Sequence, residues 1–374
     1  MRVLFISSWY PNKTEPTNGN FVEQHAISIQ PYCDLTILHV RAAEVSKVEI
    51  EPISNHGLKG FIIYFPQKKL NFFSYLKYYR RGFKLIEESV GNIDLIHLNV
   101  ILPVGIIAYL AKVFKDIPYL ITEHATIYKK ERRNELSALR KVASQIIARK
   151  AAYICPVSHN LAAEMQSLGI KGNYKVIPNA VNTSLFKAVE KNNSKFNLLH
   201  ISTLVEEHKN GKGIIRTIKK LSQKRNDFKF KVISDLNINQ FEKNAINLGV
   251  NMNLFELEGA KNAFEISEAF NTADVFILFS NYENLPCVII EAHASGVPVI
   301  STDVGGINEM ITTDNGILIP PKDEDALLTA IEAVMDKKIT FDHKAIERKA
   351  KAIYSYQSVG QQYFELYQQI LGLK

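Results

Sequence analysis

Short apolar segments alternate with longer amphipathic segments along almost the whole chain. The short segments are rich in β-branched residues, which predicts β-strands, and the longer segments have the apolar spacing of helices. Alternation of this kind predicts parallel sheets covered by helices on both faces. Two series of strands are predicted: Val3–Ser7, Leu35–Val40, Gly60–Phe65, Leu95–Leu98, Tyr119–Thr122 and Tyr153–Val157, then Phe196–Ile201, Phe228–Ile233, Asn253–Leu257, Val275–Phe279 and Val297–Ser301. Between the strands of the first series the predicted helices are Asn20–Gln30, Phe72–Val90, Gly105–Phe114 and Glu135–Lys150.

The two series predict two doubly wound, Rossmann-like α/β domains. A chain of 374 residues exceeds the ~250–300 residues at which single cores stop growing. The polar stretch 182–194 has no periodic pattern, so we place the boundary there, between domains 1–184 and 185–353. Ligands of open α/β sheets bind at the carboxyl ends of the strands, which predicts a cleft between two facing domains.

Composition excludes several other classes of protein. With 46% apolar and 22% charged residues, bulk disorder is not expected. The three cysteines, Cys33, Cys155 and Cys287, are far apart and odd in number, which fits neither a disulfide framework nor a zinc knuckle and indicates a cytoplasmic protein. The longest uncharged apolar run, Val100–Ala111, is shorter than the ~20 residues that span a bilayer.

The most informative segment follows the predicted strand Val275–Phe279. A polar turn contains Glu283, and Pro286 suits the first turn of a helix that ends at Gly296. A helix start exposes amide donors and the positive end of a dipole, which suits a pyrophosphate. Glu283 before the helix and Glu291 within it could then bind hydroxyls at the two ends of a nucleotide sugar. Alternatively, they are a surface turn residue and a solvated helix residue.

Further motifs make the segment recognisable. Gly305 and Gly306 form a second glycine turn at a strand-to-helix junction, where backbone can approach a ligand. Residues 283–309 resemble the E-x7-E region of the retaining GT-B glycosyltransferases of family 4 (glycosyl transferases group 1). Residues 315–323 resemble the family's next stretch, and residues 176–186 resemble its interdomain segment. The resemblance covers nearly the whole chain.

The resemblance implies roles for this segment and for the whole fold. Glu283 is expected to contact the donor sugar, Glu291 the ribose, and Asn284, Leu285 and Pro286 to lie near the sugar and phosphate. The family implies two Rossmann-like domains facing across a cleft, and a C-terminal helix, 354–374, that packs back on the first domain. Transfer is expected to retain the anomeric configuration and to need neither a cofactor nor a metal.

Positive charge for the leaving diphosphate is expected from Lys209, which matches the family's lysine. A preorganised cation stabilises charge that develops on a leaving phosphate, although a solvated loop lysine is the alternative. Family members usually carry an arginine where this chain has Thr203, so one of two expected cations is missing. Lys212 or Arg216 are candidates to replace it. Ser202, Thr203, Gly259 and Lys261 complete the expected donor-binding residues.

In the N-terminal domain, the strand 119–122 is followed by His124, which matches a family histidine that reaches donor sugar and acceptor. His97, with Asn99, ends a similar strand. A satisfied structural histidine is the alternative for both. The loop after the first strand resembles the family's acceptor loop, so Gly19 and Asn20 are expected near the acceptor, with Gly19 allowing close backbone approach.

Asp323 and Asp325 imitate the metal-binding D-x-D motif of the other large glycosyltransferase fold. They directly precede an apolar helical pattern, so an N-cap with an acidic first turn explains them better. We therefore expect no metal.

The charge is uneven along the chain. Net charge is +7, and residues 1–185 hold 23 Lys and Arg against 14 Asp and Glu, or +9. Cations are interleaved with aromatic residues in Lys68–Arg81, and further cations lie in Lys129–Lys150. These stretches suit either docking on an anionic membrane that holds a lipid-linked acceptor or an ordinary solvated surface. No nucleic-acid recognition motif accompanies the charge.

The sequence thus predicts a glycosyltransferase that uses a UDP- or GDP-sugar and a glycan or lipid-linked hydroxyl acceptor, in surface polysaccharide, lipopolysaccharide or related glycan synthesis. We expect it in the cytoplasm, peripheral to the inner face of the plasma membrane. A nucleotide-sugar epimerase and a non-catalytic subunit of another transferase are the alternatives.

Overall fold

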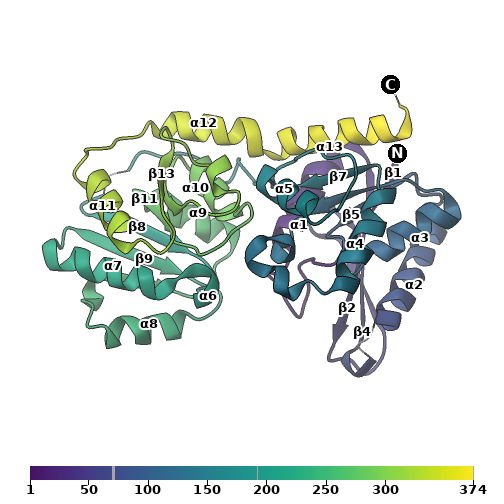
Figure 1. Ribbon diagram of the computed structural model, residues 1–374, viewed down its shortest axis with the longest axis horizontal. Helices are drawn as coiled ribbons and strands as arrows, with labels where there is room; N and C mark the ends of the chain where they lie inside the picture. Colours follow the sequence, from purple (N-terminus) through teal and green to yellow (C-terminus); the bar gives the residue numbers. More distant parts are fainter. Residues whose placement is uncertain (70–71, 192, 374) are drawn as a thin grey trace. The chain divides into compact units, whose positions relative to one another are not determined.

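The computed structural model describes residues 1–69, 72–191 and 193–373, which fold into two compact units (Figure 1). Unit 1 comprises Met1–Ala180 and Tyr356–Lys374, and unit 2 comprises Val181–Ser355. The divisions therefore lie after residues 180 and 355, where the sequence suggested 184 and 353. Each unit is built on a largely parallel sheet with helices, so the predicted fold class is confirmed.

Unit 1 contains a seven-stranded sheet in the order β3-β4-β2-β1-β5-β6-β7. All neighbouring strands are parallel except β3 and β4. The strands are β1 Arg2–Ser7, β2 Asp34–Ala43, β3 Glu49–Ile53, β4 Lys59–Pro66, β5 Leu95–Asn99, β6 Tyr119–Glu123 and β7 Tyr153–Pro156. The helices are α1 Asn20–Ile29, α2 Phe72–Val90, α3 Gly105–Lys115, α4 Ala138–Lys150 and α5 His159–Ser167, and the C-terminal α13 Tyr356–Leu371 also belongs to this unit.

The C-terminal helix is part of the core of unit 1. α13 packs against α1, and its apolar residues join those of β1 and β2 in one buried cluster. Gly360 has no space for a Cβ, because that atom would collide with the backbone carbonyl of Ser28 on α1. This glycine therefore sets how closely the two helices approach each other.

Unit 2 contains a six-stranded parallel sheet in the order β10-β9-β8-β11-β12-β13. Its strands are β8 Phe196–Ile201, β9 Phe228–Ile233, β10 Phe255–Glu258, β11 Val275–Leu278, β12 Val299–Thr302 and β13 Gly316–Ile319. Its helices are α6 Glu206–Lys209, α7 Gly211–Lys224, α8 Ile238–Asn247, α9 Ala263–Thr272, α10 Cys287–Ala294, α11 Glu324–Met335 and α12 His343–Tyr354. The strand order reverses between β8 and β11, so their carboxyl ends form the topological switch point of the sheet.

Most predicted elements are found, and the differences have physical causes. The strands β3 and β13 were not predicted: β3 is a half-exposed edge strand that contains Pro52, and β13 is an edge strand that begins with a glycine and is only partly buried. α4 begins at Ala138 because the side chain of Ser137 accepts a hydrogen bond from the amide of Arg140. The predicted terminal helix is found as α13, which begins at Tyr356 because Ser355 is extended and separates it from α12. No helix among the described residues is both long and apolar enough to cross a membrane.

Candidate active site

The loop between β11 and α10 forms the centre of the candidate site in unit 2. The hydroxyl of Thr302 donates to the carbonyl of Ser280 (2.6 Å), and the amide of Gly306 donates to the carbonyl of Asn284 (3.0 Å). Gly305 and Gly306 form the glycine turn that was expected to face a ligand. The amide of Gly306 therefore holds the loop between β11 and α10 in place. α10 follows with Pro286 as its N-cap and ends before Gly296, as predicted.

A second loop, after β8, is tied to the first one. The amide of Asn281 donates to the carbonyl of His208 (2.8 Å), and its side-chain amide donates to the carbonyl of Glu207 (2.9 Å). The short helix α6 ends at Lys209, and Asn210 closes it in the left-handed conformation. These bonds place Lys209 and Glu283 together although they lie 74 residues apart in sequence.

Glu283 is a buried carboxylate with three side-chain neighbours. Nζ of Lys209, itself buried, bonds to Oε1, and the hydroxyl of Ser280 donates to the same oxygen (2.8 Å). Nε2 of His208 lies 3.4 Å from Oε2. Burial acts to raise the pKa of Glu283, but the charge of Lys209, the neighbouring His208 and the hydrogen bond from Lys209 lower it to about 2. The glutamate is therefore ionised at physiological pH.

Glu291 has a different electrostatic environment. It lies in the middle of α10, half-buried, and burial raises the pKa of its carboxyl to about 7. Among the described residues, no side chain or backbone group forms a hydrogen bond to this carboxyl. At neutral pH both protonation states are populated, so it can donate a hydrogen bond as well as accept one. This environment differs from that of a fully solvated helix residue, and the expected contact between Glu291 and a ribose stays a prediction.

Ser202 and Thr203 form the turn that follows β8. The hydroxyl of Ser202 contacts Nε2 of His200 (2.8 Å) and accepts a hydrogen bond from the amide of Leu204 (3.1 Å). The carbonyl of Thr203 accepts a hydrogen bond from the side chain of Asn237 (3.3 Å). The side chain of Ser202 thus shapes the turn, while neither residue supplies charge.

Gly259 and Lys261 lie after β10. Lys261 forms ion pairs with Glu258 (3.3 Å) and Glu265 (3.1 Å), and Gly259 is exposed with open space around its Cα. No contact in unit 2 joins these residues to the Lys209–Glu283 pair within the described structure. Their expected role in donor binding stays a prediction.

In unit 1, His124 follows β6 and is buried against α1. Its ring lies 4.7 Å from that of Phe21 and 5.2 Å from that of His25, measured between centroids. Burial, with smaller contributions from His25 and His97, lowers the pKa of His124 well below its usual range, so the imidazole is neutral. Gly19 precedes α1 with φ of 77°, and a Cβ there would lie 2.6 Å from the carbonyl carbon of Trp9. Asn20 is exposed at the start of α1.

His97 and Asn99 both lie on β5, but their surroundings differ. The ring nitrogens of His97 contact the hydroxyls of Tyr367 (2.5 Å) and Thr122 (2.7 Å), and the ring is fully buried. This environment favours the structural alternative for His97. Asn99 is also buried, yet its amide nitrogen and oxygen have no hydrogen-bond partner among the described residues. Asn99 therefore remains the better candidate on this strand for a polar ligand.

Glu123 is a buried carboxylate that the sequence did not single out. It accepts hydrogen bonds from the amides of Ile101 (2.9 Å), His124 (2.9 Å) and Ala125 (2.8 Å). Burial raises its pKa to about 7 despite these bonds. It fixes the turn that carries His124, which makes it a structural partner of that histidine.

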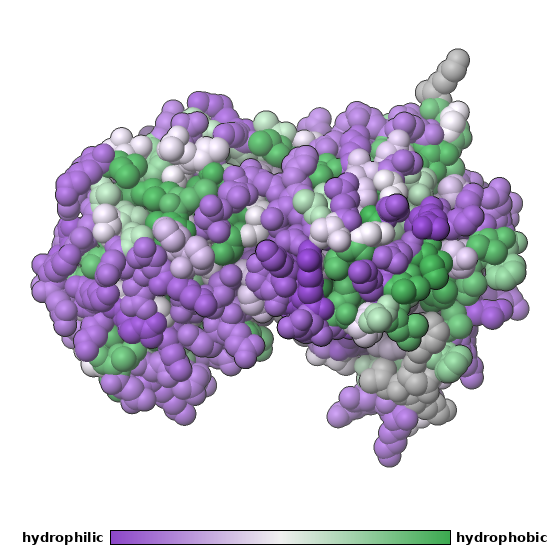
Figure 2. Space-filling view, viewed as in Figure 1, coloured by the Kyte–Doolittle hydropathy of each residue, from purple (hydrophilic) through white to green (hydrophobic). Residues whose placement is uncertain are grey.

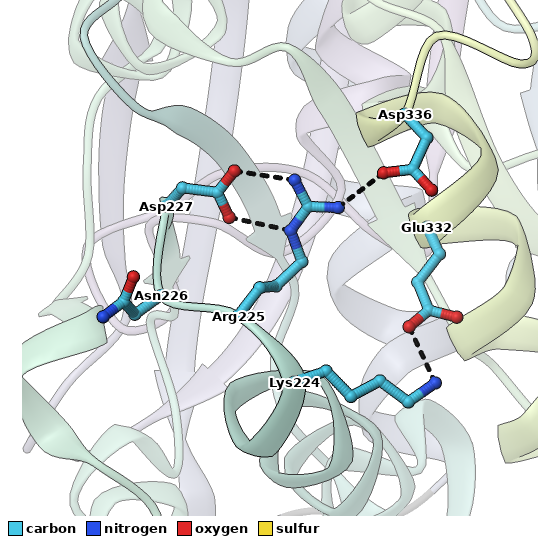
Figure 3. Close-up of a pocket in the computed structure, with 6 residues that line it drawn as sticks. All are labelled: Lys224, Arg225, Asn226, Asp227, Glu332 and Asp336. Atoms are coloured by element: carbon cyan, nitrogen blue, oxygen red, sulfur yellow. Dashed lines mark hydrogen bonds and ion pairs between the residues drawn. The ribbon is translucent and has the colours of Figure 1, made fainter.

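Elsewhere in unit 2, a hollow is lined by charged residues that form ion pairs with one another (Figure 3). Arg225 pairs with Asp227 (2.6 Å) and Asp336 (2.7 Å), and Lys224 pairs with Glu332 (2.8 Å). It lies at the amino end of β9, the opposite end of the strand from the one where α/β proteins bind ligands.

The D-x-D sequence is confirmed as a helix start. The carboxylate of Asp323 accepts a hydrogen bond from the amide of Ala326 (2.8 Å), and Asp325 pairs with Lys220.

The sequence analysis missed two residues of the site, His208 and Ser280. Both touch Glu283 through the folding of two separate loops, so no local pattern indicates their contacts. The one available signal was position, since His208 directly precedes Lys209 and Ser280 directly follows a predicted strand.

The fold and the buried lysine–glutamate pair at the switch point of unit 2 define a GT-B glycosyltransferase. The family model for glycosyl transferases group 1 matches residues 181–352, and the model for glycosyltransferase family 4 matches residues 33–185. The chain therefore belongs to this glycosyltransferase family.

Individual relatives match this chain over nearly its full length. A Bacillus subtilis protein assigned to teichuronic acid biosynthesis as the glycosyltransferase TuaC is 24% identical, over 97% of this chain and 95% of its own length. The structure resembles sucrose-phosphate synthase from Thermosynechococcus elongatus with a TM-score of 0.81 and 19% identity, over 100% and 99% of the two chains. It also resembles Anabaena HepE in complex with UDP-glucose with a TM-score of 0.75 and 18% identity, over 99% and 100%.

Lys209→Met tests the buried pair. The substitution leaves the Glu283 carboxylate buried without its main counter-charge, and losing one partner of a buried pair costs about 3–5 kcal/mol. We expect the calorimetric unfolding transition of unit 2 to move down by roughly 2–4 °C per kcal/mol. Fluorescence of Trp9, the single tryptophan, which lies in unit 1, should report an unchanged transition there.

Lys220→Met is the matched control, because the pair between Lys220 and Asp325 is exposed. Exposed pairs contribute little, so this variant should melt like the wild type. Equal shifts of the unfolding transition for the two variants would contradict the expectation that the buried pair between Lys209 and Glu283 is needed for the stability of unit 2.

Glu291→Gln tests the raised pKa. A raised folded-state pKa means that stability is lost as pH rises through about 7, because the ionised form is then buried. The glutamine variant has no such loss, so its stability relative to wild type should increase from pH 5.5 to pH 8.5, by up to about 2 kcal/mol. Melting temperatures at both pH values measure this difference. Glu268→Gln, an exposed site on α9, should show no such trend.

Proposed function

We propose that the protein transfers a glycosyl group from a UDP- or GDP-sugar to a hydroxyl acceptor, with retention and without a metal or cofactor. The observation that carries this proposal is the buried Lys209–Glu283 pair beside the start of α10. The pair joins a cation suited to a diphosphate with a carboxylate suited to sugar hydroxyls. Structures of HepE contain UDP or UDP-glucose, which supports a nucleotide-sugar donor for this chain.

Each residue of unit 2 then has a distinct task. Lys209 neutralises the charge that develops on the leaving diphosphate, and the amides at the start of α10 add donors with the favourable end of the helix dipole. Glu283, ionised, accepts hydrogen bonds from the donor sugar. Glu291 binds the ribose, where a carboxyl with a pKa of about 7 can both accept and donate. Asn284, Leu285 and Pro286 line the path between them.

On the acceptor side, we propose that His124, Asn99, Gly19 and Asn20 bind the hydroxyl substrate. The neutral ring of His124 and the unpartnered amide of Asn99 offer uncharged donors and acceptors. The relative assigned to teichuronic acid biosynthesis supports a surface polysaccharide, or its lipid-linked precursor, as the product.

We further propose that unit 1 docks on an anionic membrane, at the cytoplasmic face, through α4. Leu139, Val142 and Ile146 lie on one face of this helix with exposed fractions of 79%, 49% and 50%. The cations Arg140, Arg149 and Lys150 are exposed on the same helix. Figure 2 shows hydrophobic side chains gathered over this region among hydrophilic ones. An apolar face flanked by cations suits an interface with anionic lipids.

The other basic stretch, Lys68–Arg81, includes residues 70 and 71, which lie outside the described residues. The docking proposal therefore rests on α4.

A donor panel tests the proposed function. Saturating UDP-, GDP- or ADP-glucose at 100 times its dissociation constant should stabilise the protein by about 2.7 kcal/mol, visible as a rise in melting temperature. Nucleotide release that requires an acceptor supports transfer. Release without an acceptor would indicate another reaction. An epimerase would convert the sugar without releasing nucleotide, and a non-catalytic subunit would do neither.

Glu283→Gln should lower acceptor-dependent release at least about 100-fold, because it removes a charged contact made to the reacting sugar. Glu268→Gln serves as the matched control and should leave release unchanged. Unchanged turnover in Glu283→Gln would contradict the mechanism.

Ile146→Asp tests membrane docking. Moving an isoleucine into the membrane contributes about 1.5–3 kcal/mol, so the variant should co-sediment at least about tenfold more weakly with phosphatidylglycerol vesicles. Raising the salt concentration should weaken wild-type binding. Ile246→Asp, at a similarly exposed site on α8 of unit 2, is the matched control. Equal binding by both variants, or preference for neutral vesicles, would exclude docking through α4.

A further inference from the structure

The strand order of unit 1 reverses between β1 and β5, so the carboxyl ends of these two strands form the switch point of its sheet. Open α/β sheets bind ligands at such a point. The loop after β1 begins with Ser8 and Trp9, and the loop after β5 begins with Val100. Ser8 joins the two loops, because its amide donates to the carbonyl of Asn99 (3.4 Å) and its hydroxyl donates to the carbonyl of Leu102 (3.2 Å).

The loop after β5 begins with a strained residue. Val100 has φ of 65°, a left-handed conformation that is rare for a β-branched side chain. Two bonds from β6 hold it there: the amide of Val100 donates to the carbonyl of Thr122 (2.8 Å), and the amide of Ile101 donates to the carboxylate of Glu123 (2.9 Å). Strain that the surroundings hold in place is concentrated at binding and catalytic sites.

Three buried side chains at this switch point carry polar atoms that have no hydrogen-bond partner within the described residues. They are the amide of Asn99 (0% exposed), Nε2 of His39 (1%) and the hydroxyl of Tyr10 (2%). The strand register places His39, Ser7 and Asn99 in one row across β2, β1 and β5, so their side chains share a face of the sheet. Burying such groups unpaired is costly, and a polar ligand that pairs with them removes the cost.

Trp9 adds an aromatic surface to these polar groups. Its side chain is half-buried, and its ring meets that of Phe21 on α1 edge to face, 6.0 Å between centroids. Ser7 fixes the backbone of Trp9, because the amide of Trp9 donates to the Ser7 hydroxyl (3.1 Å), which donates to the carbonyl of Trp9. Gly19 packs directly against that carbonyl, where a Cβ would collide. The main chain that carries the indole is thus held in place before a ligand binds.

The polar groups of this switch point are uncharged. The amide of Asn99 can both donate and accept, and burial lowers the pKa of His39 to about 4, so that its ring is neutral. Two cations at the loop after β1, Lys13 and Arg41, each form an ion pair with a glutamate. A pyranose matches these features, because one face of the ring presents C–H groups that pack on an indole and its hydroxyls both donate and accept. A phosphate would need a cation, which Asn99, His39 and Trp9 do not supply.

We propose that the switch point of unit 1 binds a neutral pyranose ring of the acceptor, with the apolar face of the ring against Trp9 and a hydroxyl bonded to Asn99. This inference rests on the proposed function and narrows its acceptor: the recognised group is a sugar and not the phosphate of a lipid carrier. Trp9 and Asn99 are then residues that determine acceptor specificity, and His39 and Tyr10 can bind a further hydroxyl.

Trp9 is the single tryptophan, so its fluorescence reports directly on this site. The protein is saturated with UDP and titrated with the methyl glycosides of glucose, galactose, mannose and N-acetylglucosamine. At least one glycoside should change the emission with a saturable dependence on its concentration. Inorganic phosphate and glycerol 3-phosphate should leave the emission unchanged.

Variants identify the residues that bind the responding glycoside. Asn99→Ala and Trp9→Ala should each weaken its binding about tenfold, which corresponds to roughly 1.4 kcal/mol. Trp9→Phe keeps an aromatic surface and should lose less. Calorimetry measures all affinities, since the Trp9 variants are not fluorescent. The matched controls are the exposed Asn247→Ala on α8 and Phe114→Ala on α3, which should bind like the wild type. Unchanged binding of UDP-glucose, together with melting curves, establishes that each variant is folded.

The inference would be overturned if no glycoside changed the emission, if the phosphates changed it instead, or if Asn99→Ala and Trp9→Ala bound the glycoside as tightly as the wild type. In each case UDP-glucose binding and acceptor-dependent nucleotide release would still support the proposed function. If neither UDP-glucose nor GDP-glucose binds the wild type, the proposed function is wrong and the inference falls with it.

Discussion

The site of unit 2 depends on one buried ion pair, between Lys209 and Glu283. Removing two charges from water costs several kcal/mol per ion, and the attraction between them repays this only with good geometry. A pair of apolar residues of the same size would stabilise the unit equally well or better. The pair is therefore poorly explained by stability, and its place at the carboxyl end of the sheet favours a role in binding.

The backbone is organised to hold this pair. Asn281 bonds to the carbonyls of His208 and Glu207, while Thr302 and Gly306 hold the loop that carries Glu283. The two loops come from the adjacent strands β8 and β11, where the strand order reverses. The preorganisation that transfer chemistry needs is thus supplied by main-chain hydrogen bonds and not by the charges themselves.

The fold was predictable from sequence because every strand of the two predicted series is a short apolar run between amphipathic segments. The same periodicity does not reveal an edge strand such as Glu49–Ile53, whose residues are half-exposed. Within the site, the local motif around Glu283 indicated a donor loop, and the resemblance added Lys209. Contacts between distant loops could not be predicted from the sequence. The stacking of His208 on Tyr282 and the two hydrogen bonds of the buried His97 ring depend on tertiary packing, which leaves no local pattern in the sequence.

The candidate site residues of the two units differ in their ionisation. In unit 1 burial lowers the pKa of His25 and His39 to about 4 and that of His97 and His124 as well, so these four buried imidazoles are neutral. In unit 2 the interior keeps an ionised pair. Neutral imidazoles suit a hydroxyl acceptor, which must be bound without being trapped by charge, and an ionised pair suits a diphosphate. Arg140, Arg149 and Lys150 on α4 lie on the surface of unit 1, which is where the proposed docking on an anionic membrane requires cations.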